Sequence, residues 1–308
     1  MKRDTAQPTV NPLADSSAHH NTPAFAQRRR VLASMAKCSI APAALTVMAP
    51  AALAQNAPAP VLGTPGKDAG WIPTPAPMVE GMLRMAGVSK NDLVVDLGSG
   101  DGRIPIFAAK AFGARGLGIE LNRDLVAYSD ESAKKEGVAD RVRFVNGDIF
   151  EVDFSQGTVL SLFMPPQVNA RLLPKILAMR PGTRVVSYVF AMADWEPDDW
   201  VFFDAVQGML WVVPARFDGR WRIETQGPGA DTYEVRLTQR YQKVDGRFLF
   251  GTAPLPLFDA NVLGDRLRFT VLVGERRFDF EGYNKGGAVE GTLHVTGEPR
   301  RTFRATRL

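Results

Sequence analysis

The 308-residue sequence is poor in the side chains that most enzymes use for nucleophilic, metal or redox chemistry. It has one cysteine, Cys38, and three histidines, His19, His20 and His294. The cysteine and two of the histidines fall in the first 54 residues, so the rest of the chain has no cysteine and one histidine. A disulfide framework, a cysteine nucleophile and a Cys/His zinc site are therefore excluded there, and we predict no metal.

The remaining histidine, His294, lies in the alternating stretch Gly-Thr-Leu-His-Val-Thr-Gly. That alternation is typical of a β-strand, which favours an ordinary strand histidine. The alternative is a Ser-His-Asp triad, which would have to be built on this one side chain.

An excess of one charge sign is also missing once the N-terminus is set aside. The formal charge of the chain is +4, but residues 1–54 hold six basic and two acidic side chains, and residues 55–308 hold 31 of each. The basicity therefore belongs to the N-terminal segment. A neutral remainder gives no electrostatic reason to expect a nucleic-acid partner.

A long hydrophobic run is absent, but the N-terminus carries a shorter one. Residues 28–30 are three arginines, and the apolar run 39–54 that follows contains two prolines and ends in Ala52-Leu53-Ala54. The run is shorter than the roughly 20 residues that span a bilayer. The order of these features predicts a twin-arginine-like export signal over 1–54, a periplasmic location, and no membrane span after its removal. The alternative is a disordered basic tail on a cytoplasmic protein.

The rest of the chain divides into three segments by pattern. Residues 55–70 are rich in Pro, Ala and Gly and predict a flexible lead-in. Residues 71–214 alternate strand and helix patterns, which predicts an α/β domain with a doubly wound, mainly parallel sheet. Residues 215–308 are alternating segments punctuated by glycine, which predicts a small all-β barrel or sandwich.

Within 71–214 the expected strands are 93–97, 116–121, 141–145, 158–163 and 184–190. The expected helices are 104–112, 125–136 and 167–179, after a first helix that carries Val79, Met82 and Leu83 at helical spacing. We also expect a closing antiparallel hairpin, with strands 200–206 and 209–213 and a turn at Gln207-Gly208.

The stretch Val-Val-Asp-Leu-Gly-Ser-Gly-Asp-Gly-Arg, residues 94–103, has the pattern of a nucleotide-binding loop. Asp96 ends a buried strand, and the glycines at 98, 100 and 102 permit a tight turn into a helix N-terminus, which attracts ligands. A dinucleotide fingerprint would run Gly-x-Gly-x-x-Gly, whereas Gly98, Gly100 and Gly102 alternate strictly. This spacing argues against an NAD-linked oxidoreductase.

Asp-x-Gly-x-Gly-x-Gly resembles motif I of the class I S-adenosylmethionine-dependent methyltransferases. The segments Trp-Ile-Pro-Thr-Pro, Gly-Ile-Glu-Leu-Asn, Leu-Phe-Met-Pro-Pro and Pro-Gly-Thr-Arg-Val-Val-Ser-Tyr-Val-Phe occur around it in one order. Together they resemble the family that contains the lysine methyltransferases of the ATP synthase c-subunit and the adenine nucleotide translocase, with bacterial relatives. The resemblance covers residues 71–198 and implies S-adenosylmethionine as cofactor.

Further cofactor-binding residues follow from strand ends and from the resemblance. Glu120 ends the second strand, where a carboxylate can accept hydrogen bonds from ribose hydroxyls. The resemblance implies that Asp148 accepts from the adenine amino group and that Pro73 and Thr74 close over the cofactor. We also expect Asp101 to reach the methionine ammonium group.

The acceptor is harder to predict. Phe163-Met164-Pro165-Pro166 occupies the place where amino-methylating DNA enzymes carry Asn/Asp-Pro-Pro-Tyr, but Met164 replaces the polar residue and Gln167 the aromatic one. We therefore disfavour nucleic acid and predict a protein lysine or a small molecule. Met164, Pro165 and Trp195 are the hypothesised acceptor wall, with Trp195 as a core aromatic in the alternative interpretation.

Two functions remain open on the sequence. The first is in-line methyl transfer, which requires alignment and a desolvated site more than a dedicated catalytic residue, so that no catalytic base is assigned. The alternative is an exported, non-catalytic protein that keeps the cofactor fold and recognises an envelope partner with its β-domain.

Overall fold

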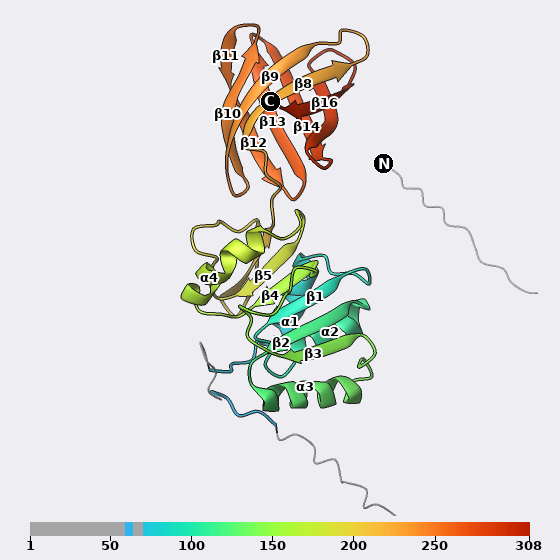
Figure 1. The fold of residues 1–308 in the computed structure, drawn as a ribbon, viewed down its shortest axis with the longest axis vertical. Helices are drawn as coiled ribbons and strands as arrows, with labels where there is room; N and C mark the ends of the chain where they lie inside the picture. Colours follow the sequence, from blue (N-terminus) through green and yellow to red (C-terminus); the bar gives the residue numbers. More distant parts are fainter. Residues whose placement is uncertain (1–58, 64–69) are drawn as a thin grey trace, which may run out of the picture. The chain divides into compact units, whose positions relative to one another are not determined.

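The computed structural model describes residues 59–63 and 70–308, so the predicted export signal and most of the lead-in lie outside the described residues. The described residues belong to one compact unit, Ala54–Leu308. This unit contains a seven-stranded mixed sheet and, after it in the chain, an antiparallel barrel (Figure 1).

The mixed sheet has the strand order β3-β2-β1-β4-β5-β7-β6. Its strands are β1 (Leu93–Leu97), β2 (Arg115–Glu120), β3 (Val142–Asn146), β4 (Val159–Leu162), β5 (Arg184–Tyr188), β6 (Asp199–Phe203) and β7 (Val206–Val212). Strands β1 to β5 pair in parallel, and β7 is antiparallel to both of its neighbours. The order reverses between β1 and β4, which is where such sheets bind ligands. The predicted Rossmann-type sheet is confirmed.

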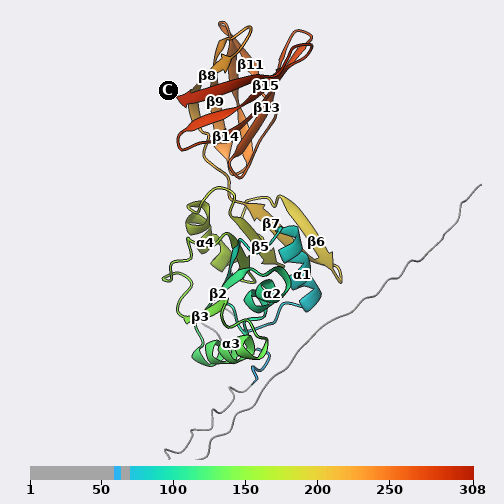
Figure 2. The same cartoon turned by 90° about the vertical axis from the view of Figure 1, so that its right-hand side faces the viewer.

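Four helices cover the two faces of this sheet, as Figure 2 shows. They are α1 (Ala76–Met85), α2 (Arg103–Phe112), α3 (Arg123–Lys135) and α4 (Pro166–Leu177). Apolar residues of α1 and α2 share one core with Val94, Val159 and Val186 on one sheet face. Apolar residues of α4 pack with Val95 and Leu160 on the other face. Because residues alternate in direction along a strand, β1 supplies both cores.

The closing hairpin exists, but its predicted turn is wrong. The chain reverses at Asp204 and Ala205, which both have positive φ, whereas Gln207 and Gly208 lie inside β7. Gly208 is needed for close packing, because a Cβ there would lie 2.7 Å from Cγ of Met82. The glycine marks the contact with α1 and not the turn.

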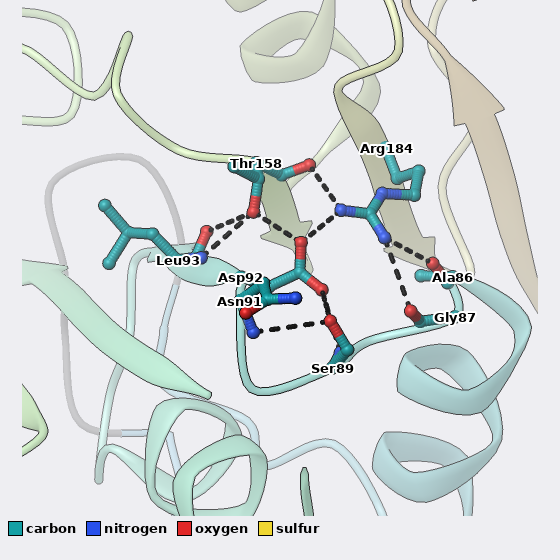
Figure 3. Close-up of polar contacts among 8 residues, drawn as sticks. All are labelled: Ala86, Gly87, Ser89, Asn91, Asp92, Leu93, Thr158 and Arg184. Atoms are coloured by element: carbon teal, nitrogen blue, oxygen red, sulfur yellow. Dashed lines mark hydrogen bonds and ion pairs between the residues drawn. The ribbon is translucent and has the colours of Figure 1, made fainter. Parts of the chain in front are cut away.

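A polar cluster joins the amino ends of β1, β4 and β5 (Figure 3). The Asp92 carboxylate accepts from the Thr158 hydroxyl at 2.8 Å, from the Ser89 backbone N–H at 2.8 Å and from the Arg184 guanidinium. Arg184 also donates to the Ala86 carbonyl at 3.1 Å. Burial alone would raise the Asp92 pKa, but the bonds from Arg184, Thr158 and Ser89 outweigh it and hold that pKa below its usual value.

The second part of the unit is a closed antiparallel barrel. Its strands are β8 (Gly219–Gln226), β9 (Thr232–Arg240), β10 (Lys243–Phe250), β11 (Ala253–Pro256), β12 (Phe258–Leu263), β13 (Arg266–Val273), β14 (Arg276–Asn284), β15 (Ala288–Val295) and β16 (Arg301–Arg307). Successive strands pair around the ring, β10 continues to β12 past the short β11, and β16 returns to β8. The predicted all-β region is therefore confirmed, and its form is a barrel. His294 is an exposed residue of β15, opposite Asp279.

Side chains fill the barrel interior. Phe269 and Phe280 stack with ring centroids 4.6 Å apart, and Phe248 and Phe303 contact the same Phe280 ring. A cavity of about 10 Å³ lies among the interior side chains, which is no more than one water molecule occupies. The barrel interior thus forms a packed core, and this cavity is far smaller than the roughly 300 Å³ or more of a small-molecule binding pocket.

Candidate active site

One cavity of about 290 Å³ lies at the carboxyl ends of β1 and its neighbouring strands. The predicted cofactor and acceptor residues that line it are Pro73, Thr74, Asp96, Gly98, Gly100, Asp101, Glu120, Asp148, Met164 and Pro165. The structure therefore brings together residues from five separate segments of the sequence. Their roles toward a bound cofactor stay predictions.

The glycine loop has no space for side chains. Gly98, Gly100 and Gly102 all have positive φ, a region that glycine adopts without strain. A Cβ on Gly98 would lie 1.9 Å from Cε of Met164, and a Cβ on Gly100 would lie 2.3 Å from Nε1 of Trp71. These two side chains pack directly on the loop, so the segment ahead of α1 and the segment after β4 both meet it.

Gly102, a predicted cofactor-binding residue, is not among the cavity-lining residues. It is the left-handed N-cap of α2, and a Cβ there would lie 2.5 Å from the Phe144 ring. Its function in this structure is the sharp entry of the chain into α2, which turns the free N–H groups of that helix toward the cavity end of the sheet.

Glu120 is held rigidly at the end of β2. One carboxylate oxygen accepts from the Gly100 backbone N–H and the other from the Asn122 backbone N–H, each at 2.9 Å. Asn122 in turn caps α3 through its side chain. Because a carboxylate oxygen can accept more than one hydrogen bond, Glu120 can bind hydroxyls while it fixes the glycine loop.

Asp101 is already paired in this structure. Its carboxylate accepts hydrogen bonds from Nε of Arg103 at 2.9 Å and from Nη2 of Arg103 at 2.6 Å. Nη1 of Arg103 donates to the Thr74 carbonyl at 2.9 Å. Arg103 therefore ties the glycine loop to the 71–75 segment, which the resemblance placed over the cofactor. Sequence reasoning gave Arg103 no role, although it directly follows the glycine motif.

Asp96 is the most buried acid of the cavity, with 4% of its surface exposed. Burial raises its pKa to about 8, the nearby carboxylates of Asp101 and Glu120 add to the rise, and Ser161 opposes it. Among the described residues the hydroxyl of the cavity-lining Ser99 is buried without a hydrogen-bond partner. A buried acid without a cation and an unsatisfied hydroxyl are both features that a polar, cationic ligand would satisfy.

The other end of the cavity is aromatic and apolar. Phe163, Met164, Pro165 and Phe190 line it, and the rings of Phe163 and Phe190 stack with centroids 5.8 Å apart. Phe163 and Phe190 are residues that sequence reasoning did not assign to the site. Their signal was positional, since Phe163 directly follows β4 and Phe190 lies two residues after the end of β5.

The prediction that Trp195 lines the acceptor wall is wrong. Trp195 is 1% exposed and lies outside the cavity lining. Its ring packs against Trp211 and stacks on Tyr241, and its indole N–H donates to the Gln242 side chain at 2.9 Å. A large aromatic with a satisfied N–H is a core residue, as the alternative interpretation held.

Charge in this cavity has one predominant sign. Four acidic side chains line it, Asp96, Asp101, Glu120 and Asp148, against one basic side chain, Arg103. Asp148 also accepts from the Phe150 backbone N–H at 2.9 Å.

Over residues 59–63 and 70–308 no cluster of histidine, cysteine or acidic side chains could hold a metal ion. The same residues contain no helix with the length and hydropathy of a membrane span.

Comparison with known proteins agrees with this geometry. Residues 96–199 match the family described as ANTKMT methyltransferase domain. A protein-lysine N-methyltransferase of Saccharolobus islandicus is 43% identical over 131 residues, which are 42% of this chain and 81% of that protein. The lysine N-methyltransferase of the ATP synthase c-subunit from Xenopus laevis is 38% identical over 42% of this chain, which spans 56% of the frog enzyme.

A solved structure of an RNA methyltransferase from Salinibacter ruber, in complex with S-adenosylhomocysteine, is 46% identical. It aligns with 47% of this chain and 96% of its own, at a TM-score of 0.47. The chain belongs to this family of S-adenosylmethionine-dependent methyltransferases, and S-adenosylmethionine is its cofactor. It is an enzyme, and these relatives give no support to the non-catalytic alternative.

The cavity fits this cofactor on its own features. The tight glycine loop admits close approach of a ligand to backbone, Glu120 offers acceptors for ribose hydroxyls, and the carboxylates of Asp96 and Asp101 suit a molecule with sulfonium and ammonium charges. The partly buried Trp71 and the buried Thr74 lie over the loop from the side of α1.

Proposed function

We propose that this enzyme methylates the side-chain amine of a protein lysine. The observation that supports it is the aromatic and apolar end of the cavity, formed by Phe163, Met164 and Phe190, beside the acidic part that suits the cofactor. Aromatic faces attract ammonium and methylammonium groups while they pack against an apolar side-chain stem. The named relatives are enzymes of protein lysines.

The chemistry requires little from the protein beyond position. The cofactor supplies a methyl group on a positive sulfur; the lysine nitrogen lone pair forms the new N–C bond as the C–S bond breaks. The amine must lose a proton before it attacks, and the cavity provides carboxylates and no histidine for that purpose. Phe163, Phe190 and Met164 exclude water and align the amine.

An RNA acceptor is the second candidate, since the solved relative from Salinibacter ruber is described as an RNA methyltransferase. The cavity opposes it, because phosphates would approach a lining that is mainly acidic and the single lining arginine is already paired with Asp101. RNA is therefore one arm of the test.

The test is transfer of a labelled methyl group from S-adenosylmethionine to three acceptor pools: total protein, total RNA, and small molecules below about 1 kDa. We expect label in protein that acid hydrolysis releases as methyl-lysine, and none with a Gly100→Val variant. Label confined to RNA or to small molecules contradicts the proposal.

We also propose that the protein is exported after it has folded with its cofactor. The support is the arrangement of Arg28 and Arg29, the apolar run and the small-residue end of the first 54 residues. Replacement of both arginines by lysine should retain the protein in the cytoplasm. Cell fractionation measures this, and an unchanged distribution contradicts export by this route.

A further inference from the structure

The segment that leaves β5 carries unusual backbone strain. Val189 and Ala193 have φ of +69° and +52°, and a β-branched residue such as valine rarely adopts that region. The Phe190 N–H donates to the Tyr188 carbonyl at 2.8 Å, which closes a three-residue γ-turn around Val189. Strain of this kind persists only where surrounding contacts determine the conformation.

This post-β5 segment, residues 189–198, reaches the active site at its start. Phe190 lines the cavity and stacks on Phe163. Its carbonyl accepts from the Ser187 hydroxyl at 2.7 Å and, more weakly, from the Asn169 side chain at 3.4 Å. The position of the Phe190 ring therefore depends on the path that this segment takes after β5.

A turn of the barrel contacts the same segment further along. We call residues 240–243, between β9 and β10, the barrel turn. Tyr241 stacks on Trp195 at 5.7 Å and donates to the Asp194 carboxylate at 2.7 Å. The Gln242 side chain accepts from the Trp195 indole and donates to the Glu196 carbonyl at 2.7 Å.

Two ion pairs accompany these contacts, Arg240 with Asp194 and Lys243 with Glu196. All four side chains are more than half exposed, so these pairs add little. The contacts that fix the segment are those to the buried Trp195. The barrel turn is itself strained, because Tyr241 has φ +54° at a position that favours glycine.

We infer that the barrel turn is a positioning element for the acceptor side of the active site. It holds the post-β5 segment in its strained path and so fixes Phe190 in the cavity. Tyr241 and Gln242 are positioning residues, since neither lines the cavity. The family match ends at residue 199, so the barrel turn is a feature of this chain outside the matched domain.

The inference rests on the proposed lysine acceptor only for its kinetic arm. The test uses the full chain with Gln242→Ala and with Tyr241→Gly, which relieves the positive φ and removes the stacking ring. Tyr241→Phe keeps the ring and is the conservative control. Tyr283→Ala removes an exposed barrel tyrosine whose hydroxyl contacts Glu281 on its own strand.

We expect amide hydrogen exchange over 188–198 to rise about tenfold in Gln242→Ala and Tyr241→Gly, and to stay unchanged in both controls. Affinity for S-adenosylhomocysteine should stay within about twofold of wild type, because the cofactor residues lie on other segments. With a lysine acceptor, KM should rise about tenfold or more while kcat changes less, since a small displacement of a positioning group costs much alignment.

Unchanged amide exchange over 188–198 in folded variants overturns the inference. A loss of cofactor affinity as large as the rise in KM for the acceptor also overturns it. If the wild-type enzyme transfers no methyl group to lysine, the proposed function fails, while the exchange measurement still decides whether the barrel turn positions the segment. Should Tyr241→Gly not fold, Gln242→Ala gives the same comparison.

Discussion

An aspartate lies near each end of strand β1, Asp92 directly before it and Asp96 as its penultimate residue, and the two have opposite surroundings. Asp92, at the amino end, binds Arg184, Thr158 and Ser89, and its pKa is held below the usual value. Asp96, at the carboxyl end four residues later, is more deeply enclosed, has no cationic partner, and has its pKa raised to about 8. The acid at the amino edge of the sheet therefore has its partners within the protein, whereas the acid at the carboxyl edge has no cationic partner there.

The difference separates stability from ligand binding. A paired, buried carboxylate joins three strand ends, whereas an unpaired one costs free energy that a cationic ligand can recover. The linked pH dependences have opposite sign. Stability from Asp92 is present above its unfolded pKa, near 4, and is lost as the pH falls. Asp96 holds a proton in the folded state between about pH 4 and 8, so its contribution falls as the pH rises through that window.

The largest effect should follow from Gly100→Val at the carboxyl edge. The new Cβ would lie 2.3 Å from the Trp71 indole at a residue with φ +54°, so either the loop or Trp71 must move into the cofactor space. We expect affinity for S-adenosylmethionine to fall more than roughly 1,000-fold, about 4 kcal/mol, by calorimetric titration.

The matched control is Gly137→Asn, beyond the carboxyl end of α3. Gly137 has φ +70° and open space around it, and asparagine tolerates that conformation. It should bind the cofactor as wild type does. Retained binding in Gly100→Val would contradict the assignment of the loop.

At the amino edge of the sheet, Arg184→Met should destabilise the fold without weakening the binding of the cofactor. It leaves the Asp92 carboxylate, 8% exposed as a side chain, without its cation. We expect a loss of about 3 kcal/mol in the free energy of unfolding, measured with urea, because the buried Asp92 then remains charged without a cation. The double variant with Asp92→Asn should recover part of this loss. Weaker cofactor binding in folded Arg184→Met would contradict the assignment of the amino edge to stability and of the carboxyl edge to ligand binding.

How far the sequence predicts this molecule depends on how local each signal is. Strand Leu93–Leu97 agrees with its predicted bounds, and the other core strands differ by one or two residues, since buried runs and caps such as Asn122 are read within one segment. The predicted position of the hairpin turn was wrong because Gly208 allows close packing against Met82, which lies on a helix far away in the sequence. In the all-β region, Gly246, Pro254 and Pro256 interrupt the alternating pattern of strands β10 to β12, so that pattern does not define these strands.

The active site shows the same limit. Asp96, Glu120 and Asp148 were predictable because parallel strands end at one edge of a sheet. Phe190 and the Trp195 environment were not, because a strained γ-turn at Val189 and a turn of the barrel decide where these rings lie. Neither feature leaves a pattern in the residues nearby.

Cofactor binding should release a proton from Asp96. A sulfonium and an ammonium charge near the carboxylate favour its ionised form, so binding lowers its pKa from about 8. Affinity for S-adenosylmethionine should therefore increase with pH, by about tenfold between pH 6.5 and 8.5, which is about 1.4 kcal/mol. Titrations in buffers of different ionisation enthalpy measure the released proton. Asp96→Asn should give a flat profile, and a flat wild-type profile would contradict the linkage.

The smallest effect tests whether like charges on the exposed exterior of the barrel affect stability. On the barrel exterior, Arg236 lies directly opposite Arg220 on β8 and Arg247 on β10, and all three are exposed. Like charges opposite each other on adjacent strands repel. Arg236→Glu should raise the free energy of unfolding by a few tenths to about 1 kcal/mol, and Arg236→Gln by about half as much.

Because these side chains are solvated, about 1 M salt should remove most of the difference between Arg236→Glu and wild type, measured by urea unfolding. A gain that persists in salt, or a loss of stability, would mean that the arginine row is held by contacts other than charge. The Asp96 linkage lies in a buried site and should be much less sensitive to the same salt, because solvent screens an exposed charge whereas the enclosed carboxylate can be compensated only by a ligand.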